Sequence, residues 1–277
     1  MPDIELSAGT IEYEDTGGSG PVVVLLHGLV MDGSLWRHVV RDLRADHRCV
    51  VPTLPLGGHR RPMHAAADLS LHGHSRIVAE FLERLDLRHV TLVQNDHGAA
   101  LVLAGERPER VARLVLVSCE AFDNYPPGLP GKVVALAAGL PGGLNAAVQP
   151  MRLRPLRRLP IALGWMAKRP VPHEVTDNWL RPLLAQGQIR RDLIKYLRST
   201  RKRDMIEASE RLRSFDRPAL IIWAADDRVM PPEHGPRLAE LLPRGRFVEI
   251  PDSYTLIPED QPAELSRTIR QFVRDTT

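Results

Sequence analysis

Short apolar runs alternate with helical patterns along most of the chain. The run PVVVLLHG at 21–28 is continuous and apolar and ends in glycine, which is typical of a strand buried on both faces of a parallel sheet. The later runs of the same character lie at 47–53, 89–94, 111–118, 218–224 and 246–250. Between them, residues 75–87 place apolar side chains on one stripe of a helix, namely Ile77, Val78, Phe81, Leu82 and Leu85. This alternation predicts an α/β fold with a mostly parallel sheet and helices on both faces.

Two regions depart from this alternation. Residues 3–15 predict an antiparallel hairpin that turns at Gly9. Residues 124–214 are rich in Pro, Gly, Arg and Leu and show helix-like segments but no strand pattern, although a predicted strand stands on either side. We interpret them as an inserted helical cap over the C-terminal edge of the sheet, where open α/β sheets bind ligands. The predicted domains are therefore a core of 1–123 and 215–277 and a cap of 124–214.

The composition is that of an ordinary globular protein. Of its 277 residues, 43% are hydrophobic and 26% are charged, which is enough to bury a large core. The net charge is only +3, and arginine and lysine gather in two stretches, 151–160 and 189–204. Because no aromatic ladder accompanies these charges, we interpret both stretches as solvated helical faces and expect no nucleic-acid partner.

The cysteines and the apolar runs indicate the compartment. Cys49 and Cys119 stand beside apolar, strand-like residues, and two cysteines cannot form a disulfide framework, so we expect buried free thiols in a reducing environment. Residues 1–15 lack the charged-then-apolar order of a signal peptide. No apolar run approaches the ~20 residues that span a bilayer. These features predict a cytoplasmic protein without membrane contact.

Four motifs follow one another in a recognisable order. A buried strand ends in His27–Gly28, and a strand–turn–helix follows at 91–118 with the elbow QNDHG at 94–98. The stretch LIIWAADDRVMPPEHG at 220–235 and the loop IPDSYTLIPEDQPAEL at 250–265 come later. In this order the motifs resemble the α/β-hydrolase superfamily over nearly the whole chain. The resemblance implies an eight-stranded sheet with an active site built on the elbow.

Asp96 occupies the nucleophile position of this elbow, which is similar to the haloalkane dehalogenase and epoxide hydrolase branches of the superfamily. A carboxylate can attack an alkyl carbon or an epoxide and form an ester intermediate. The resemblance places the acid of the triad at Asp227, after the seventh strand. Some dehalogenases carry it after the sixth strand, where this chain has Glu120. The competing interpretations are a helix N-cap for Asp96 and a turn residue for Asp227.

Thr255 stands where the superfamily has its catalytic histidine, and no histidine follows His234. Hydrolysis of an aspartyl ester needs a base that deprotonates water, and a threonine hydroxyl does not ionise near neutral pH. With Asp96 alone, the first half-reaction can occur and the second is expected to stall. The predicted catalytic set is therefore an atypical triad of Asp96, Asp227 and Thr255.

The candidate substrate contacts are His27, Leu29, His97, Glu120 and Tyr254. The backbone N–H groups of Leu29 and His97 are expected to form an oxyanion-type site, and the His97 ring is expected to face the ligand as an acid or base. His27 is alternatively a packing residue of its turn. Leu29 and His97 replace the Asn and Trp with which dehalogenases hold the leaving halide. The match to that branch is therefore weak among the residues that contact the substrate. No metal site and no cofactor is predicted.

The sequence thus predicts an α/β-hydrolase-fold enzyme that acts on a small, largely apolar molecule through Asp96. Because Thr255 removes the usual activation of water, we expect a non-hydrolytic reaction such as an elimination, isomerisation or cyclisation. Two alternatives stay open: a dehalogenase- or epoxide hydrolase-like enzyme with a substitute base, and a catalytically silent ligand-binding protein. The oligomeric state is expected to be a monomer or a homodimer.

Overall fold

A computed structural model describes residues 1–276 of the chain, and eight strands form one sheet in it. Their spatial order is β1-β2-β4-β3-β5-β6-β7-β8. The β1–β2 and β2–β4 pairs are antiparallel and the other pairs are parallel. The strands are β1 (Asp3–Leu6), β2 (Gly9–Asp15), β3 (Val22–Leu26), β4 (Arg48–Pro52), β5 (Val90–Asp96), β6 (Val111–Cys119), β7 (Ala219–Ala224) and β8 (Gly245–Ile250). The predicted α/β fold, its eight-stranded sheet and its N-terminal hairpin are confirmed.

The central strands are buried on both faces, as their continuous apolar runs predict. Every residue of β5 and β7 is buried, whereas β8 at the edge of the sheet is partly exposed. β5 also continues two residues beyond the predicted strand, so that it ends at Asp96. The predicted nucleophile is therefore carried by the last position of a central strand, next to β3 on one side and β6 on the other.

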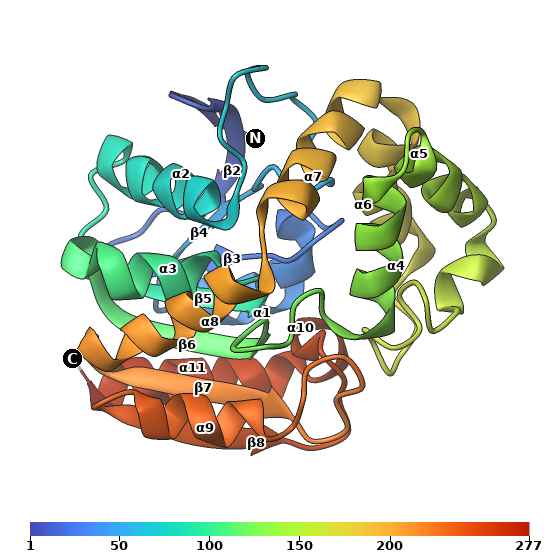
Figure 1. Ribbon diagram of the computed structural model, residues 1–277. Helices are drawn as coiled ribbons and strands as arrows, with labels where there is room; N and C mark the ends of the chain where they lie inside the picture. The colour runs from blue at the N-terminus through green and yellow to red at the C-terminus, as the bar shows by residue number, and fades with distance from the viewer. Residues whose placement is uncertain (277) are drawn as a thin grey trace.

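Helices cover both faces of the sheet, as predicted (Figure 1). α1 packs against α11, whereas α3 lies between α2 and α8. The helices of these layers are α1 (Arg37–Leu43), α2 (Leu71–Arg84), α3 (Ala99–Glu106), α8 (Lys202–Arg211), α9 (His234–Leu241), α10 (Ile257–Asp260) and α11 (Pro262–Asp275). α2 begins four residues before the predicted start because the Ser70 hydroxyl accepts a hydrogen bond from the Gly73 N–H at 3.1 Å and caps the helix.

Between β6 and β7 the described chain contains helices and no strand. These are α4 (Gly128–Gly139), α5 (Gly143–Val148), α6 (His173–Ala185), α7 (Gly187–Ser199) and α8, with 3-10 turns at Gln149–Arg152, Arg154–Arg158 and Leu212–Ser214. α4, α5 and α6 lie together beyond one end of the sheet (Figure 1). The division into a core and a cap at 124–214 stays a prediction, and Thr277, the last residue of the predicted core, lies outside the described residues.

Two smaller features bear on the sequence-based expectations. Cys49 and Cys119 are buried free thiols, as predicted. No helix within residues 1–276 combines the length and the apolar character that crossing a membrane requires.

Candidate active site

The elbow after β5 holds Asp96 in a strained backbone conformation. Its φ is 67°, in the left-handed region that costs a non-glycine residue about 1–3 kcal/mol. The Asp96 carbonyl accepts a hydrogen bond of 2.9 Å from the Glu120 N–H at the end of β6, which fixes the turn against the neighbouring strand. Gly28 makes room for the carboxyl group, since a Cβ atom at that position would lie 2.0 Å from Asp96 Oδ2. The strand, the turn and Gly28 together fix the direction of this side chain.

The carboxyl group of Asp96 is almost completely removed from water. The residue is 4% exposed, and its Oδ2 accepts one hydrogen bond, from the Leu29 N–H at 3.0 Å. Burial, helped by the nearby Asp227 charge and opposed by the Leu29 hydrogen bond, raises the pKa of Asp96 to about 7. At neutral pH the group is therefore divided between its acid and its carboxylate form.

Asp227 and Thr255 lie together, as predicted. Asp227 Oδ1 accepts hydrogen bonds from the backbone N–H groups of Val229 and Met230, each at 2.9 Å, and from Thr255 Oγ1 at 2.7 Å. Thr255 is fully buried. Burial raises the pKa of Asp227 above its usual value, and these hydrogen bonds oppose the shift. The threonine hydroxyl thus donates to the acid, as the histidine of the superfamily would, but it carries no nitrogen that could remove a proton from water.

Two residues that the sequence analysis missed connect the elbow, the loop of Thr255 and the segment between β6 and β7. The Asn95 side-chain amide donates to the backbone oxygens of Thr255 at 2.9 Å and Val117 at 2.8 Å, and so ties the elbow to the Thr255 loop. Asp260 accepts N–H hydrogen bonds from Tyr254 at 2.9 Å and from Lys168 at 2.8 Å. It therefore joins the same loop to the segment between β6 and β7. Their positions in QNDHG and IPED were visible in the sequence, but their partners lie far away along the chain.

Asp96 lines an apolar cavity of about 140 Å³. The loop after β3 contributes Leu29 to its wall, and the segment between β6 and β7 contributes apolar side chains such as Val134, Leu163 and Met166. Arg157 and Asp96 are the charged residues among those described around it. The arrangement can hold a small apolar molecule against one carboxyl group. Across the described residues, no group of three or more His, Cys, Asp or Glu side chains is placed to hold a metal ion.

Among the predicted substrate contacts, Leu29 lines this cavity, whereas His27 and Tyr254 do not. His27 Nδ1 lies 2.8 Å from the Gly28 carbonyl oxygen, and Nε2 accepts from the Leu54 N–H at 2.8 Å, so both ring nitrogens are engaged. Burial lowers the pKa of His27 to about 4, which keeps the ring neutral. The Tyr254 ring lies under the Arg228 guanidinium at 4.8 Å. These geometries fit packing, and a ligand contact by either residue stays a prediction.

His97 and Glu120 belong to a buried polar cluster that also does not line the cavity. The His97 ring packs against Tyr196, with ring centroids 5.0 Å apart, and the Tyr196 hydroxyl lies 3.2 Å from Glu120 Oε2. Burial lowers the pKa of His97 well below its usual value and raises that of Glu120 well above it, so both groups are neutral. A role for either residue toward the substrate stays a prediction.

The predicted oxyanion-type site stays a prediction. The Leu29 N–H donates to the Asp96 carboxylate itself, and the His97 N–H donates to the Asn95 carbonyl at 2.8 Å. The Leu29 N–H thereby stabilises the ionised form of Asp96.

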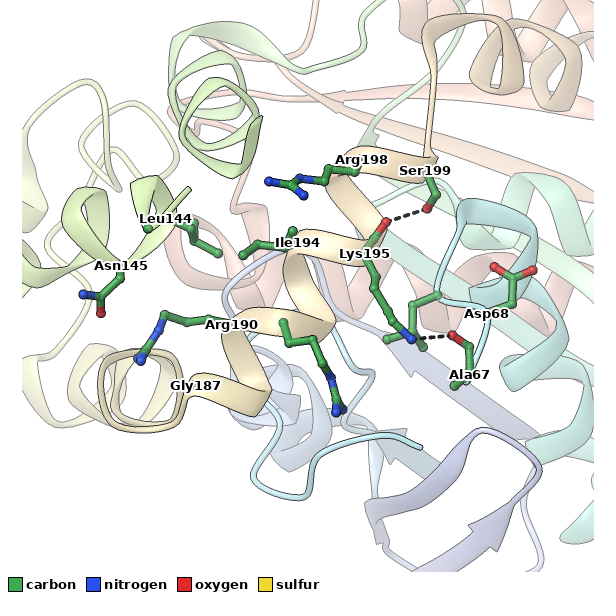
Figure 2. A pocket seen from close by; sticks show the side chains of 13 residues that line it. Ala67, Asp68, Leu144, Asn145, Gly187, Arg190, Ile194, Lys195, Arg198 and Ser199 are labelled. Atoms are coloured by element: carbon green, nitrogen blue, oxygen red, sulfur yellow. Dashed lines mark hydrogen bonds between the residues drawn. The ribbon is translucent and has the colours of Figure 1, made fainter. Parts of the chain in front are cut away.

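A second and larger hollow lies along α7. It has a volume of about 710 Å³, and α7 lines it with Arg190, Arg191, Lys195 and Arg198. Figure 2 shows Lys195 reaching toward Ala67, while Arg190 and Arg198 extend to the other side of α7, where Leu144 and Asn145 lie. Leu144 also lines the apolar cavity, so this basic groove is its neighbour, but Asp96, Asp227 and Thr255 take no part in it.

The sequence as a whole matches one family model. The model is that of the alpha/beta hydrolase fold, and residues 21–262 match it. The chain belongs to the α/β hydrolase fold family. The prediction of an enzyme of this superfamily is thereby confirmed, while the class of reaction stays open.

The curated relatives of this family member include both dehalogenases and hydrolases. A haloalkane dehalogenase of Mesorhizobium japonicum is 34% identical over a stretch that covers 41% of this chain and 37% of that protein. The matched stretch thus spans little more than a third of that dehalogenase. A 2-hydroxy-6-oxononadienedioate/2-hydroxy-6-oxononatrienedioate hydrolase of Paraburkholderia phymatum is 27% identical over 87% of this chain and 84% of the relative. The resemblance to the dehalogenase branch is confirmed as a resemblance.

Solved structures support the same family fold. A thermophilic esterase from Thermogutta terrifontis superposes with a TM-score of 0.76 at 21% identity, and the match covers 99% of this chain and 98% of the esterase. At this level of identity the likeness shows the fold alone.

Proposed function

We propose that this α/β-hydrolase-fold enzyme acts on a small, largely apolar molecule through the carboxyl group of Asp96, in a reaction of the lyase, isomerase or cyclase type. The cavity supports the nature of the substrate, because its wall is apolar except for Asp96 and Arg157. The elbow supports the role of Asp96, because a strained backbone and a buried carboxyl group are features that cluster at functional sites.

The hydrogen bond between Thr255 and Asp227 is the observation that carries the non-hydrolytic part of the proposal. In an acid–imidazole relay, the acid orients a ring whose other nitrogen removes a proton from water. Here the Thr255 hydroxyl donates to Asp227 Oδ1 at 2.7 Å, and a hydroxyl offers no base near neutral pH. An ester formed on Asp96 would therefore not be hydrolysed by the usual route.

The pKa of Asp96 supports proton transfer as its role. A general acid or base works best when its pKa lies near the working pH, and burial raises the pKa of Asp96 to about 7. The same group can therefore accept a proton at one carbon of a bound molecule and return it at another, which is what an elimination or an isomerisation requires.

A covalent probe tests the proposal. The chain is incubated with 1-bromobutane or 1,2-epoxybutane, and intact-protein mass spectrometry with peptide mapping locates any ester. With 1-bromobutane, the Asp96 oxygen attacks the carbon, the carbon–bromine bond breaks, and bromide leaves with the electron pair. With 1,2-epoxybutane, the same attack breaks the ring carbon–oxygen bond, and the alkoxide takes a proton from water to give a hydroxyl group. We expect one stable adduct per chain, on Asp96, and none in Asp96→Asn. Absence of an adduct on Asp96 combined with continuous production of butanol from the bromide, or of butane-1,2-diol from the epoxide, would contradict the non-hydrolytic assignment.

One observation favours hydrolysis with a substitute base as the second candidate function. Asp227 is buried near Asp96: burial raises its own pKa, and its charge raises the pKa of Asp96. Such a carboxylate could take a proton from water directly. In that case the wild-type chain would turn over the probes repeatedly, and Asp227→Asn would stop it at the adduct. A silent ligand-binding protein would give neither adduct nor product.

A further inference from the structure

Arg157 is an unusual residue to find in the wall of the apolar cavity. It belongs to the 3-10 turn Arg154–Arg158, is 6% exposed, and lines the cavity together with Asp96 and apolar side chains. A buried guanidinium needs partners, because it cannot lose its charge. The question is whether the protein supplies all of them.

The protein engages only part of this guanidinium. Nε donates to the Met151 carbonyl at 2.7 Å, and Nη1 donates to Thr176 Oγ1 at 3.0 Å and to Asp177. Nη2 carries two N–H groups, and it donates no hydrogen bond to any of the described residues. Asp177 is also shared, since Arg154 binds it at 2.8 Å. Donor capacity and positive charge therefore remain at Arg157.

Basic side chains also lie close to Arg157. It lines a second, smaller depression of about 30 Å³, together with Arg154, Arg158, Arg169 and His173. Leu163 belongs to both walls as well. Several arginine side chains on one face raise the local concentration of anions.

We propose that the substrate carries one carboxylate on a small apolar body, that Arg157 binds this carboxylate, and that the apolar part occupies the cavity over Asp96. This deepens the proposed function and rests on Asp96 being the reacting group. Because Nε and Nη1 are engaged by the protein, Nη2 is the nitrogen that donates a charge-assisted hydrogen bond to this carboxylate. The cavity of about 140 Å³ suits a body about the size of benzene, since apolar cavities of about 150 Å³ bind that molecule.

A purely structural role makes a different prediction. Through Asp177 and Thr176, Arg157 also ties its 3-10 turn to α6. If that were its whole function, replacing it would weaken the binding of charged and uncharged ligands alike. Recognition of a carboxylate instead weakens only the charged ligand.

Benzoate and benzamide separate the two roles, because they share a skeleton and differ in charge. Their dissociation constants are measured by calorimetry at pH 6, where Asp96, with a pKa of about 7, is mostly protonated and does not repel benzoate. We expect the wild-type chain to prefer benzoate by about tenfold or more, the usual gain of a charged hydrogen bond. Arg157→Met should remove this preference and leave benzamide binding in place.

Arg154→Met is the matched control, because Arg154 shares Asp177 and lines the outer depression but not the cavity. It should keep the preference. Should Arg157→Met fail to fold, Arg157→Gln removes the charge while it retains donors, and the same loss is expected. The inference is overturned if the wild-type chain shows no preference or binds neither ligand, if both ligands weaken equally in a folded Arg157 variant, or if Arg154→Met also loses the preference. No adduct on Asp96 is needed for these measurements, so this inference and the proposed function can fail separately.

Discussion

The apolar cavity and the basic groove differ in how their polar groups are satisfied. In the groove, Arg198 Nε donates to the Ala138 carbonyl at the end of α4 at 2.7 Å, and Arg190 donates to the Leu183 carbonyl near the end of α6 at 2.8 Å. These cations lie against water and tie helix ends together. In the cavity, Asp96 has one hydrogen bond to its carboxyl group and almost no contact with water.

The difference shows that volume alone does not mark the reactive site. The groove has about five times the volume of the cavity, about 710 Å³ against about 140 Å³. The cavity nevertheless holds the carboxyl group whose pKa burial has raised to about 7. Desolvation of one group in a small space changes its chemistry, and the larger volume of the groove supplies no such burial of a carboxyl group.

The most severe test of this comparison substitutes one residue in the cavity and one in the groove. Asp96→Asn should lower the rate of adduct formation with 1-bromobutane by roughly 10⁴-fold or more, as loss of a nucleophile commonly does. Arg190→Gln in the groove should leave that rate unchanged. Mass spectrometry over time gives both rates. If Arg190→Gln lowered the rate as much as Asp96→Asn does, the result would contradict our placement of the reaction in the apolar cavity.

Thr255→His should add the missing base beside Asp227, which already accepts the Thr255 hydroxyl at 2.7 Å. Base catalysis contributes about 10² to 10⁴-fold, so hydrolysis of the Asp96 ester should become measurable as butanol production. Asp96→Asn in the same background should abolish the gain. Because Tyr254 is adjacent, a structure of the variant is needed beside the assay. An imidazole within hydrogen-bond reach of Asp227 that brought no gain would remove hydrolysis from the account of this site.

Asp96→Asn should also stabilise the folded protein, and the gain should appear as the pH rises above the ordinary aspartate pKa of 3.8. The pKa of Asp96 is raised from 3.8 to about 7, so between these values the folded chain keeps a proton that the unfolded chain releases. The free energy of unfolding of the wild type therefore falls as pH rises through this range and the loss is complete above about pH 7. At pH 8 the variant should gain about 4 kcal/mol relative to pH 4. Urea unfolding at both values measures this gain.

The matched control for that stability test is Asp226→Asn, which changes a carboxylate that is about half exposed beside Lys168. It should show no gain at pH 8. An equal gain in both variants would mean that general surface charge, and not burial of Asp96, sets the pH dependence.

The smallest expected effect is the pH dependence of the reaction itself. Attack on 1-bromobutane needs the ionised carboxylate, so the rate of adduct formation should rise with pH and level off above the pKa of about 7. Between pH 6 and pH 8 the increase should be about tenfold. A rate that is already constant from pH 5 upward would show that Asp96 titrates as an exposed carboxylate does, and the contrast between the two hollows would lose its basis.

Much of the fold followed from the sequence because it rests on local patterns. Continuous apolar runs predicted the buried strands, and the elbow QNDHG placed Asp96 at the end of β5. The pairing of Asp227 with Thr255 followed from the family order of the motifs. These features depend on residue types and on their order along the chain, both of which can be seen without a structure.

The parts that could not be predicted depend on contacts between distant segments. Asn95 reaches Thr255 across 160 positions, and no local pattern specifies that pair. Arg157 belongs to a stretch that was interpreted as a solvated face, yet its side chain is buried in the cavity wall. The raised pKa of Asp96 likewise follows from burial, which only the packed structure defines.

Counting the bromide released per chain tests the central claim most directly. The claim is that the desolvated Asp96 carboxylate reacts with an alkyl carbon and that no base then frees it. Wild-type protein is mixed with a large excess of 1-bromobutane at pH 8, and bromide is measured by ion chromatography until release stops. The account predicts close to one bromide per chain, with Asp96 esterified and no further release. Steady release of many equivalents, or no release at all, would contradict it.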